Sequence, residues 1–306
     1  MSTLITGASG FIGAALARTL RVDGEEIISL VRDWTREPAG IIVRGDVTDR
    51  DLCSRILADY RITLIYHLAA QSIVSACAED PLTALRVSVM GTATLLQAVR
   101  EADRPIRVIV STSDKVYGSA PSPYTEKTPL DARHAYEVSK ACQDLVSRMF
   151  YENYKVDVQV VRAVNIYGPG DPNESRVIPR TIRRLLRGEP PLLHAGAAAM
   201  RRQYVYIDDL LDALRLVAAS GMPGEAYCVG SPSLPISVAE LIDEVSQQMT
   251  GRRIMPEISE RDAKFLEIQE QSVNDQKIRS LGWEPTTLLP DGISKTIEWY
   301  RAGGRC

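Results

Sequence analysis

The chain has 306 residues, of which 45% are hydrophobic and 25% charged, as is typical of a globular protein with a sizeable core. The formal net charge is -3 and Lys and Arg are spread along the chain, so we expect neither nucleic-acid binding nor a polybasic membrane segment. No apolar run is long enough to span a bilayer and no leader pattern precedes the first strand, so neither a membrane span nor a signal peptide is expected.

The cysteines and histidines indicate a reduced protein without a metal. The five cysteines are odd in number and show no CxxC spacing, which is expected of free thiols in a cytoplasmic protein. None of the three histidines is clustered with cysteine or carboxylate in a metal-ligand pattern. We therefore expect a cytoplasmic location and no metal site.

The chain opens with a short apolar strand at residues 2–6, a glycine-rich loop, a helical pattern through Leu20 and a second strand at 26–31. Glycines in this context permit a tight turn and close backbone approach, and the N–H groups at the helix start can hold a pyrophosphate. The alternative, a glycine-rich turn without a ligand, is disfavoured by the strand–loop–helix–strand context. The predicted cofactor contacts here are Gly7, Ser9, Gly10, Phe11, Ile12 and Gly13.

The end of the second strand bears on the choice of dinucleotide. NAD-binding folds usually place a carboxylate there for the ribose hydroxyl, but Val31 occupies the expected position and Arg32 and Asp33 follow. A guanidinium suits a 2′-phosphate, so the sequence slightly favours NADP over NAD. The alternative is that Arg32 is a solvated loop charge, and both interpretations stay open.

Strands and helices then alternate, with strands at 41–43, 64–71 and 106–111 and helices at 52–60 and 81–101. Repeated βα units with apolar strands predict a parallel doubly wound sheet, the Rossmann fold, with ligands at the carboxyl ends of the strands. Asp46 could accept a hydrogen bond from an adenine amine, and small residues near 68–70 let a cofactor lie against the backbone. The further predicted cofactor contacts are Asp46, Val47, Leu68, Ala69 and Ala70.

The stretch from Ser111 to Lys140 carries the predicted chemistry. Tyr136 and Lys140 are spaced i,i+4 on a predicted helix at 134–154, so they share one face. Tyrosine ordinarily has a pKa near ~10, and a neighbouring lysine ammonium together with a cationic nicotinamide would lower it. The phenolate could then take a hydroxyl proton while Ser113 hydrogen-bonds the same oxygen. A Tyr-x-x-x-Lys spacing alone is common, and its position after a dinucleotide motif gives it weight.

With these residues in place, the chain resembles the extended short-chain dehydrogenase/reductases that act on nucleotide sugars. The resemblance rests on TGASGFIG (6–13), HLAAQ (67–71), GTATLL (91–96), STSDKVYG (111–118), YEVSK (136–140), RAVNIYGPG (162–170), RRQYVYIDDL (201–210) and LGWEP (281–285). It implies a bound NAD(P), to which Tyr136 and Lys140 also contribute, chemistry by Ser113, Tyr136 and Lys140 at sugar C4, and usually a homodimer.

Asp114 and Lys115 distinguish the possible reactions. Ser-Asp-Lys at 113–115 is similar to the triplet of CDP-glucose-type 4,6-dehydratases, whereas epimerases generally carry small or uncharged residues there. After C4 oxidation, a base must remove the C5 proton and an acid must protonate the departing C6 hydroxyl. Asp114 would be the acid, and Lys115 would help at C5 if burial lowers its pKa. Gln71 and the segment 267–271 are also similar to this dehydratase branch. The alternative for Asp114 and Lys115 is an ordinary ion pair between the two side chains.

The C-terminal half is predicted to hold the nucleotide sugar. Arginine meets phosphate oxygens bidentately, and several polar residues lie in contexts similar to the family's diphosphate site. The predicted substrate contacts are Gln71, Asn165, Arg176, Arg202 and Arg261. Arg183, Arg184 and Arg187 are expected on a solvated helix face, and the segments 238–249 and 292–300 are expected to be core helices.

These patterns predict a dinucleotide-binding domain at 1–165, to which 200–220 return, and a smaller α/β substrate domain at 166–306. The first functional hypothesis is a lyase, a nucleotide-sugar 4,6-dehydratase that forms an NDP-4-keto-6-deoxyhexose. The second is an NDP-sugar 4-epimerase, which needs Ser113 and Tyr136 but neither Asp114 nor Lys115. The third is a non-catalytic dinucleotide-binding sensor, which would not require Tyr136 and Lys140.

Overall fold

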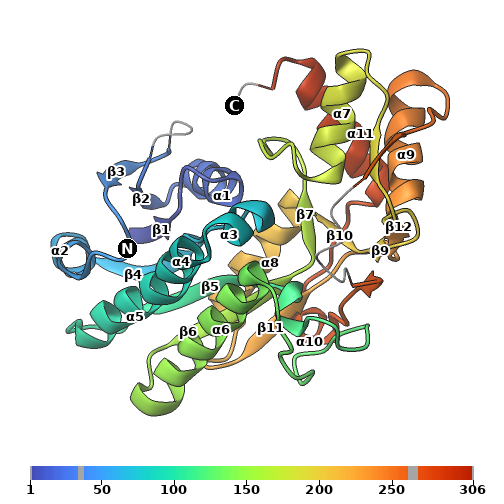
Figure 1. Cartoon of the computed structure of the whole chain (residues 1–306). Helices are drawn as coiled ribbons and strands as arrows, with labels where there is room; N and C mark the ends of the chain where they lie inside the picture. The colour runs from blue at the N-terminus through green and yellow to red at the C-terminus, as the bar shows by residue number, and fades with distance from the viewer. Residues whose placement is uncertain (1, 34–37, 261–267, 305–306) are drawn as a thin grey trace.

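A seven-stranded parallel sheet lies at the centre of the larger part of the molecule (Figure 1). The computed structural model describes residues 2–33, 38–260 and 268–304. The strand order is β11-β6-β5-β4-β1-β2-β3. In chain order, the strands are β1 (Ser2–Thr6), β2 (Glu26–Val31), β3 (Ile41–Arg44), β4 (Ile62–His67), β5 (Arg107–Ser113), β6 (Val158–Ala163) and β11 (Ala226–Val229). The predicted doubly wound parallel sheet is confirmed.

Helices cover both faces of this sheet, which explains why its central strands are continuous apolar runs. Every residue of β1 and β6 is buried, as expected when neither sheet face meets water. Helices α1 (Phe11–Val22) and α8 (Ile207–Ser220) pack on one face, and α2 (Arg50–Asp59), α5 (Gly91–Glu101) and α6 (Ala135–Tyr154) pack on the other.

The predicted helix at 81–101 is continuous but not uniform. It begins as α4 (Pro81–Leu85), passes through a π-helical turn, η1 (Arg86–Met90), and continues as α5; the short α3 (Val74–Glu79) precedes it. By length and composition Pro81–Glu101 could cross a membrane, but half of its most apolar window is buried inside the protein. It packs against α6, as a core helix of a globular protein does.

The smaller part of the molecule gathers at the upper right of Figure 1, around helices α7 (Val177–Leu186), α9 (Val238–Thr250) and α11 (Leu289–Arg301). Short sheets accompany them. One pairs β7 (Asn165–Tyr167) with β10 (Tyr204–Tyr206), another joins β12 (Ile236–Ser237), β9 (Arg201–Arg202) and β14 (Glu270–Gln271), and a third pairs β8 (Leu192–His194) with β13 (Glu257–Ser259). The remaining helix is α10 (Gln276–Arg279).

The two parts share one apolar core. Tyr167, Trp283 and Ile293 of the smaller part belong to the same buried cluster as Leu210 and Leu214 of α8. After β10, the chain returns to the large sheet as α8 and then as its edge strand β11. The division into domains at residue 165 stays a prediction.

Two strand ends differ from the sequence prediction and matter for the site. The strand predicted through Gln71 ends at His67, so residues 68–70 form a loop. Conversely, β5 continues two residues past Ser111 and ends at Ser113, because pairing with β6 extends to Ser113↔Ala163. Asp114 therefore begins a short 3₁₀ helix, η2 (Asp114–Tyr117), directly at the carboxyl end of the sheet.

Candidate active site

The glycine-rich loop between β1 and α1 has the backbone geometry of a phosphate cradle. Gly7 has φ +71°, and a Cβ there would lie 2.9 Å from the amide nitrogen of Ala69. A Cβ on Gly13 would overlap the carbonyl oxygen of Gly7. Within the described residues no side chain caps the N-terminus of α1, whose first-turn N–H groups remain available to an anion. The residues present therefore fit a dinucleotide.

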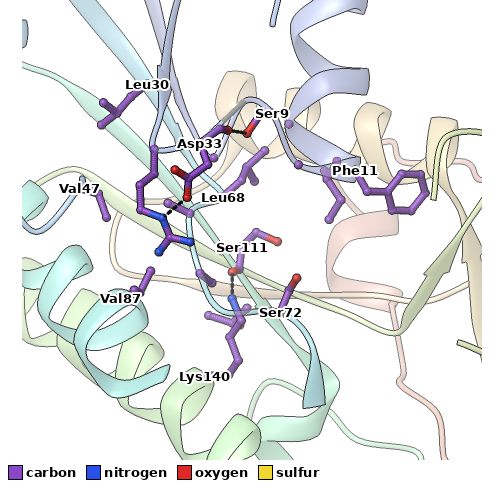
Figure 2. A pocket seen from close by; sticks show the side chains of 18 of the residues that line it. Ser9, Phe11, Leu30, Asp33, Val47, Leu68, Ser72, Val87, Ser111 and Lys140 are labelled. Carbon is purple, nitrogen blue, oxygen red and sulfur yellow. Dashed lines mark hydrogen bonds and ion pairs between the residues drawn. The ribbon is translucent and has the colours of Figure 1, made fainter. Parts of the chain in front are cut away.

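A cavity of about 310 Å³ extends from this loop across the carboxyl ends of the strands (Figure 2). Its size suits a small-molecule or cofactor site. Every residue predicted to contact the cofactor lines it: Gly7, Ser9, Gly10, Phe11, Ile12, Gly13, Arg32, Asp46, Val47, Leu68, Ala69, Ala70, Tyr136 and Lys140. The lining also includes residues that the sequence reasoning did not name as cofactor contacts: Leu30, Asp33, Gly45, Ser72, Val87, Ser111, Thr112, Ile166 and Arg176.

The residues that bear on cofactor choice are paired with each other. The Nε of Arg32 lies 2.9 Å from Oδ2 of Asp33, and their side chains are 57% and 64% exposed. Ser9 Oγ donates to the carbonyl oxygen of Asp33 at 3.0 Å, as Figure 2 shows. A guanidinium and a carboxylate thus lie together at one end of the cavity, and the pair by itself selects neither a 2′-phosphate nor a ribose hydroxyl.

Asp46 is an ionised acceptor in the same cavity. Burial raises its pKa, but hydrogen bonds from the backbone and hydroxyl of Thr48, at 2.9 and 2.8 Å, and the charge of Arg86 outweigh burial and leave the pKa below its ordinary value. Its predicted contact with an adenine amine stays a prediction.

Helix α6 presents both predicted catalytic side chains of the Tyr-x-x-x-Lys pattern to the cavity. Its N-terminus is fixed by Glu137, whose Oε2 accepts from the backbone nitrogens of Arg133 and His134 at 3.1 and 3.3 Å. Lys140 is buried, and its Nζ donates to the carbonyl oxygen of Ser111 at 3.0 Å and to Oε1 of Gln143 at 2.9 Å. Burial lowers the pKa of Lys140 to about 8.

Tyr136 differs from the expectation in one respect. Burial raises the pKa of its phenol to about 12, although a hydrogen bond with Ser113 and the charge of Arg176 act in the opposite direction. The i,i+4 spacing to Lys140 predicts a lowered pKa, but burial of the phenol itself does not follow from local spacing and acts in the opposite direction. Ser113 contacts the phenol of Tyr136, while its predicted hydrogen bond to the substrate oxygen stays a prediction. Phenolate formation at Tyr136 depends on added positive charge.

Ser113, Asp114 and Lys115 are not among the residues that line the cavity; they follow directly after Ser111 and Thr112, which do. Asp114 is 1% exposed, and its Oδ1 accepts from Ser113 Oγ at 3.0 Å. Its Oδ2 is buried and has no hydrogen-bond partner among the residues that the structure describes. Burial raises the pKa of Asp114, against the lowering effects of Lys115, Ser113 and Arg202. The pKa of Asp114 therefore lies above its ordinary value, so this carboxyl group holds its proton to a higher pH than an exposed aspartate does.

Gln271 is a candidate site residue that the sequence reasoning did not name individually. The Nζ of Lys115 donates to its Oε1 at 2.9 Å, across 156 positions of sequence. Gln271 is fully buried on β14, opposite Arg202 of β9, and its Nε2 has no hydrogen-bond partner within the described part of the chain. The resemblance of residues 267–271 to the dehydratase branch was a signal, but only strand pairing identifies Gln271.

The predicted substrate residues differ in where they lie relative to the cavity and the catalytic residues. Arg176 lines the cavity and pairs with the buried Asp171 at 2.9 Å. The charge of Arg202 lowers the pKa of Asp114, so Arg202 lies within electrostatic range of the candidate acid. Asn165 donates to the carbonyl oxygen of Gln203 at 3.3 Å, and Gln71 is half-buried next to Cys77. Arg261 lies outside the described residues.

Other charged groups belong to the surface or form no metal cluster. Arg183, Arg184 and Arg187 pair with Glu174, Glu257 and Glu189. Arg187 is exposed as predicted, whereas Arg183 and Arg184 are partly buried, so the predicted solvated face holds only in part. Within residues 2–33, 38–260 and 268–304, no group of three or more His, Cys, Asp or Glu side chains could hold a metal ion.

Comparison with known proteins identifies the family. The model of the NAD dependent epimerase/dehydratase family matches residues 3–230. The chain belongs to this family. It is therefore an enzyme of the NAD dependent epimerase/dehydratase family, which favours the two catalytic hypotheses over the sensor.

Its relatives within the family divide between two reactions. The chain is 30% identical to a UDP-glucose 4-epimerase of Mycolicibacterium smegmatis, over 98% of this chain and 99% of the relative. It is 28% identical to a dTDP-glucose 4,6-dehydratase of Xanthomonas campestris, over 97% and 92%. The solved dTDP-glucose 4,6-dehydratase of Streptomyces venezuelae, with NAD and TYD bound, superposes with a TM-score of 0.89 at 31% identity, over 99% and 97%.

Proposed function

We propose that the protein is a nucleotide-sugar 4,6-dehydratase that converts an NDP-hexose to an NDP-4-keto-6-deoxyhexose. The observation that carries the proposal is the buried carboxyl group of Asp114, whose raised pKa favours the protonated form beside Ser113 and Tyr136. A 4-epimerase needs no acid at this position, whereas elimination of the C6 hydroxyl needs one.

The first task of the site is oxidation at C4, with Tyr136 as the base. Its phenolate oxygen would take the proton of the C4 hydroxyl, and Ser113 would hydrogen-bond the same substrate oxygen. A nicotinamide held in the cavity would accept the hydride of C4 and, after water loss, give it back to C6. Its positive charge and the ammonium of Lys140 both favour the phenolate, which opposes the effect of burial on Tyr136.

The second task is elimination of water across C5 and C6, with Asp114 and Lys115 in complementary roles. The C4 ketone acidifies the C5 proton, and the amine of Lys115, held by Gln271, would accept that proton in its neutral form. Asp114 would donate its proton to the C6 hydroxyl as the C–O bond breaks and water leaves. The hydride would then add to C6, and the ammonium group of Lys115, after exchange with solvent, would return a proton to C5. Ser113 hydrogen-bonds the carboxyl group through Oδ1, so Oδ2 remains for the substrate.

A 4-epimerase is the alternative, and the near-full-length similarity to the Mycolicibacterium smegmatis enzyme favours it. Both reactions share the oxidation step, so Ser113, Tyr136 and Lys140 support them equally. They differ in whether Asp114 and Lys115 transfer protons.

The two reactions are distinguished by their products. Incubation with CDP-, dTDP-, UDP- and GDP-hexoses in deuterated water should give a product lighter by one water, with solvent deuterium at C5. A product of unchanged mass that differs only in C4 configuration would contradict the dehydratase proposal and support the epimerase.

The cofactor, the substrate class, the oligomeric state and the location of the protein are also proposals. Neighbouring structures with NAD bound support a dinucleotide, while the slight preference for NADP from Arg32 stays a prediction. Neighbours with TYD or UDP-glucose bound support a nucleotide-diphosphate hexose as substrate, and the base of that nucleotide stays open.

We also propose a cytoplasmic homodimer. Exposed apolar side chains on the helices from α4 to α6 support an interface there: Leu82, Leu85, Met90, Leu145 and Met149.

A further inference from the structure

Gln143 holds the catalytic lysine but takes no part in the chemistry described above. Lys140 has three N–H bonds, and two of them donate to the carbonyl oxygen of Ser111 and to Oε1 of Gln143. Since Lys140 also lines the cavity, its third N–H bond remains for a ligand there. Gln143 is fully buried one turn further along α6, so water does not compete with Lys140 for its amide oxygen.

The other end of the Gln143 amide is also fixed. Its Nε2 donates to Oγ1 of Thr92 at 3.0 Å, and Thr92 Oγ1 donates its single hydrogen to the carbonyl oxygen of Ser88 at 2.6 Å. His67 Nε2 lies 2.8 Å from the same Thr92 oxygen. Because the hydroxyl hydrogen of Thr92 is already used, this last hydrogen bond requires a hydrogen on Nε2 of His67.

The proton positions then follow for the rest of the chain of hydrogen bonds. With Nε2 protonated, Nδ1 of His67 accepts from Oγ1 of Thr6 at 2.8 Å. Thr6 Oγ1 in turn accepts from the backbone nitrogen of Ala69 at 3.2 Å. Burial lowers the pKa of His67 to about 3, in agreement with a neutral ring. Lys140, Gln143, Thr92, His67 and Thr6, all buried, are called here the lysine network.

We propose that Gln143 is a positioning residue that orients the ammonium group of Lys140 toward the cavity. Neutral His67, further along the lysine network, holds Thr92 and thereby Gln143 in place. The network ends at Thr6 and Ala69, which border the glycine-rich loop, so it fixes the lysine relative to the cofactor cradle. This proposal rests only on the role of Tyr136 and Lys140 in oxidation, which dehydratase and epimerase share.

The charge on Lys140 should depend on Gln143 because few groups compensate it. The amide oxygen of Gln143 stabilises the charged form in a site where burial has already lowered the lysine pKa to about 8. The titratable or charged groups around the Tyr136–Lys140 face come from several elements: Tyr136 on α6, Cys77 on α3, His67 on β4, Asp114 on η2 and Arg176 before α7.

Two variants of similar size should therefore shift the titration of Lys140 in opposite directions. Gln143→Leu removes the acceptor and should lower the pKa of Lys140 by about one to two units, the scale of a hydrogen bond to a charged group. Gln143→Glu places a carboxylate against the ammonium group and should raise the pKa instead. A purely structural role for Gln143 predicts no such opposition.

The test is the pH dependence of NAD⁺ binding to the full chain stripped of nucleotide, measured by calorimetry between about pH 6 and 10. Affinity should weaken as pH rises through the lysine pKa, with the midpoint moved down in Gln143→Leu and up in Gln143→Glu. Gln159→Leu and Gln159→Glu are matched controls, because Gln159 is equally buried on β6 and bonds Asp157 instead; their midpoints should equal that of wild type.

Equal midpoints in both Gln143 variants, or shifts in the same direction, would overturn the proposal. If Gln143→Leu fails to fold, Gln143→Met serves in its place. Nitrogen NMR of ¹⁵N-histidine-labelled protein tests the role of His67 in the lysine network. His67 should show the Nε2–H tautomer and no titration between about pH 5 and 9. A protonated Nδ1 or a midpoint near pH ~6.5 would contradict the network. Neither measurement depends on whether the product has lost water.

Discussion

Replacing Asp114 with asparagine tests the proposed elimination most directly. The change keeps the shape of the side chain and leaves an oxygen to accept from Ser113, but it removes the only proton that the carboxyl group can transfer. Cofactor binding and oxidation at C4 should persist, because the residues that line the cavity are unchanged.

The size of the effect follows from the burial of Asp114. General acid catalysis contributes about 10²- to 10⁴-fold, and a side chain that is 1% exposed is not readily replaced by bulk water as the acid. We therefore expect kcat for water loss to fall about 10³- to 10⁴-fold, which corresponds to about 4 to 5.5 kcal/mol in the barrier.

The same change should not destabilise the protein at neutral pH. A carboxyl group whose pKa is raised in the folded state contributes stability that is full below its ordinary pKa of 3.8 and is lost as pH rises through the raised value. At pH 7 the buried acid therefore opposes folding. The free energy of unfolding of Asp114→Asn should be no lower than that of wild type, and any advantage should shrink toward pH ~4.

Asp209 is the matched control, a buried aspartate that accepts from the backbone nitrogens of Thr286 and Thr287 and is not among the residues that line the cavity. Asp209→Asn should reduce stability in urea unfolding and leave kcat unchanged. Product formation is followed by mass spectrometry under saturating nucleotide sugar. Water loss by Asp114→Asn within about tenfold of wild type would refute an acid role for this residue.

Three further predictions concern the surroundings of the site. Gln271→Leu removes the acceptor for Lys115 and should slow deuterium incorporation at C5 about tenfold while NAD⁺ affinity is retained, since Gln271 does not line the cofactor cavity. The guanidinium of Arg162 is buried and donates to the two carboxylate oxygens of Asp144 at 2.7 and 2.9 Å. Asp144→Leu removes both acceptors and should lower the free energy of unfolding in urea by about 3 to 5 kcal/mol. Adding Arg162→Met should restore much of that loss. Arg32→Ala should weaken NADP⁺ binding more than NAD⁺ binding in calorimetry if the guanidinium meets a 2′-phosphate.

Each of these has an outcome that contradicts it. Unchanged exchange at C5 in Gln271→Leu would remove Lys115 from the elimination step. A double variant no more stable than Asp144→Leu alone would mean that the lost ion pair is not the cause of the instability. Equal effects of Arg32→Ala on both dinucleotides would favour the solvated-charge interpretation of Arg32.

The sequence by itself determined the local parts of the site. Glycine spacing after a strand specified the cradle at Gly7–Gly13, and the i,i+4 spacing placed Tyr136 and Lys140 on one helix face, because both depend on backbone geometry over a few residues. Apolar strands separated by helices likewise predicted the parallel sheet, since burial on both faces leaves a short-range pattern.

Only the tertiary structure decided what surrounds these parts. Gln271 reaches Lys115 through strand pairing with β9, and Gln143 reaches Thr6 through Thr92 and His67, contacts between segments that no local pattern relates. The raised pKa of Asp114 likewise comes from its burial at the junction of both parts of the molecule. Burial and hydrogen-bond partners depend on how distant segments of the chain pack. Burial and these partners in turn set the pKa values of the catalytic groups.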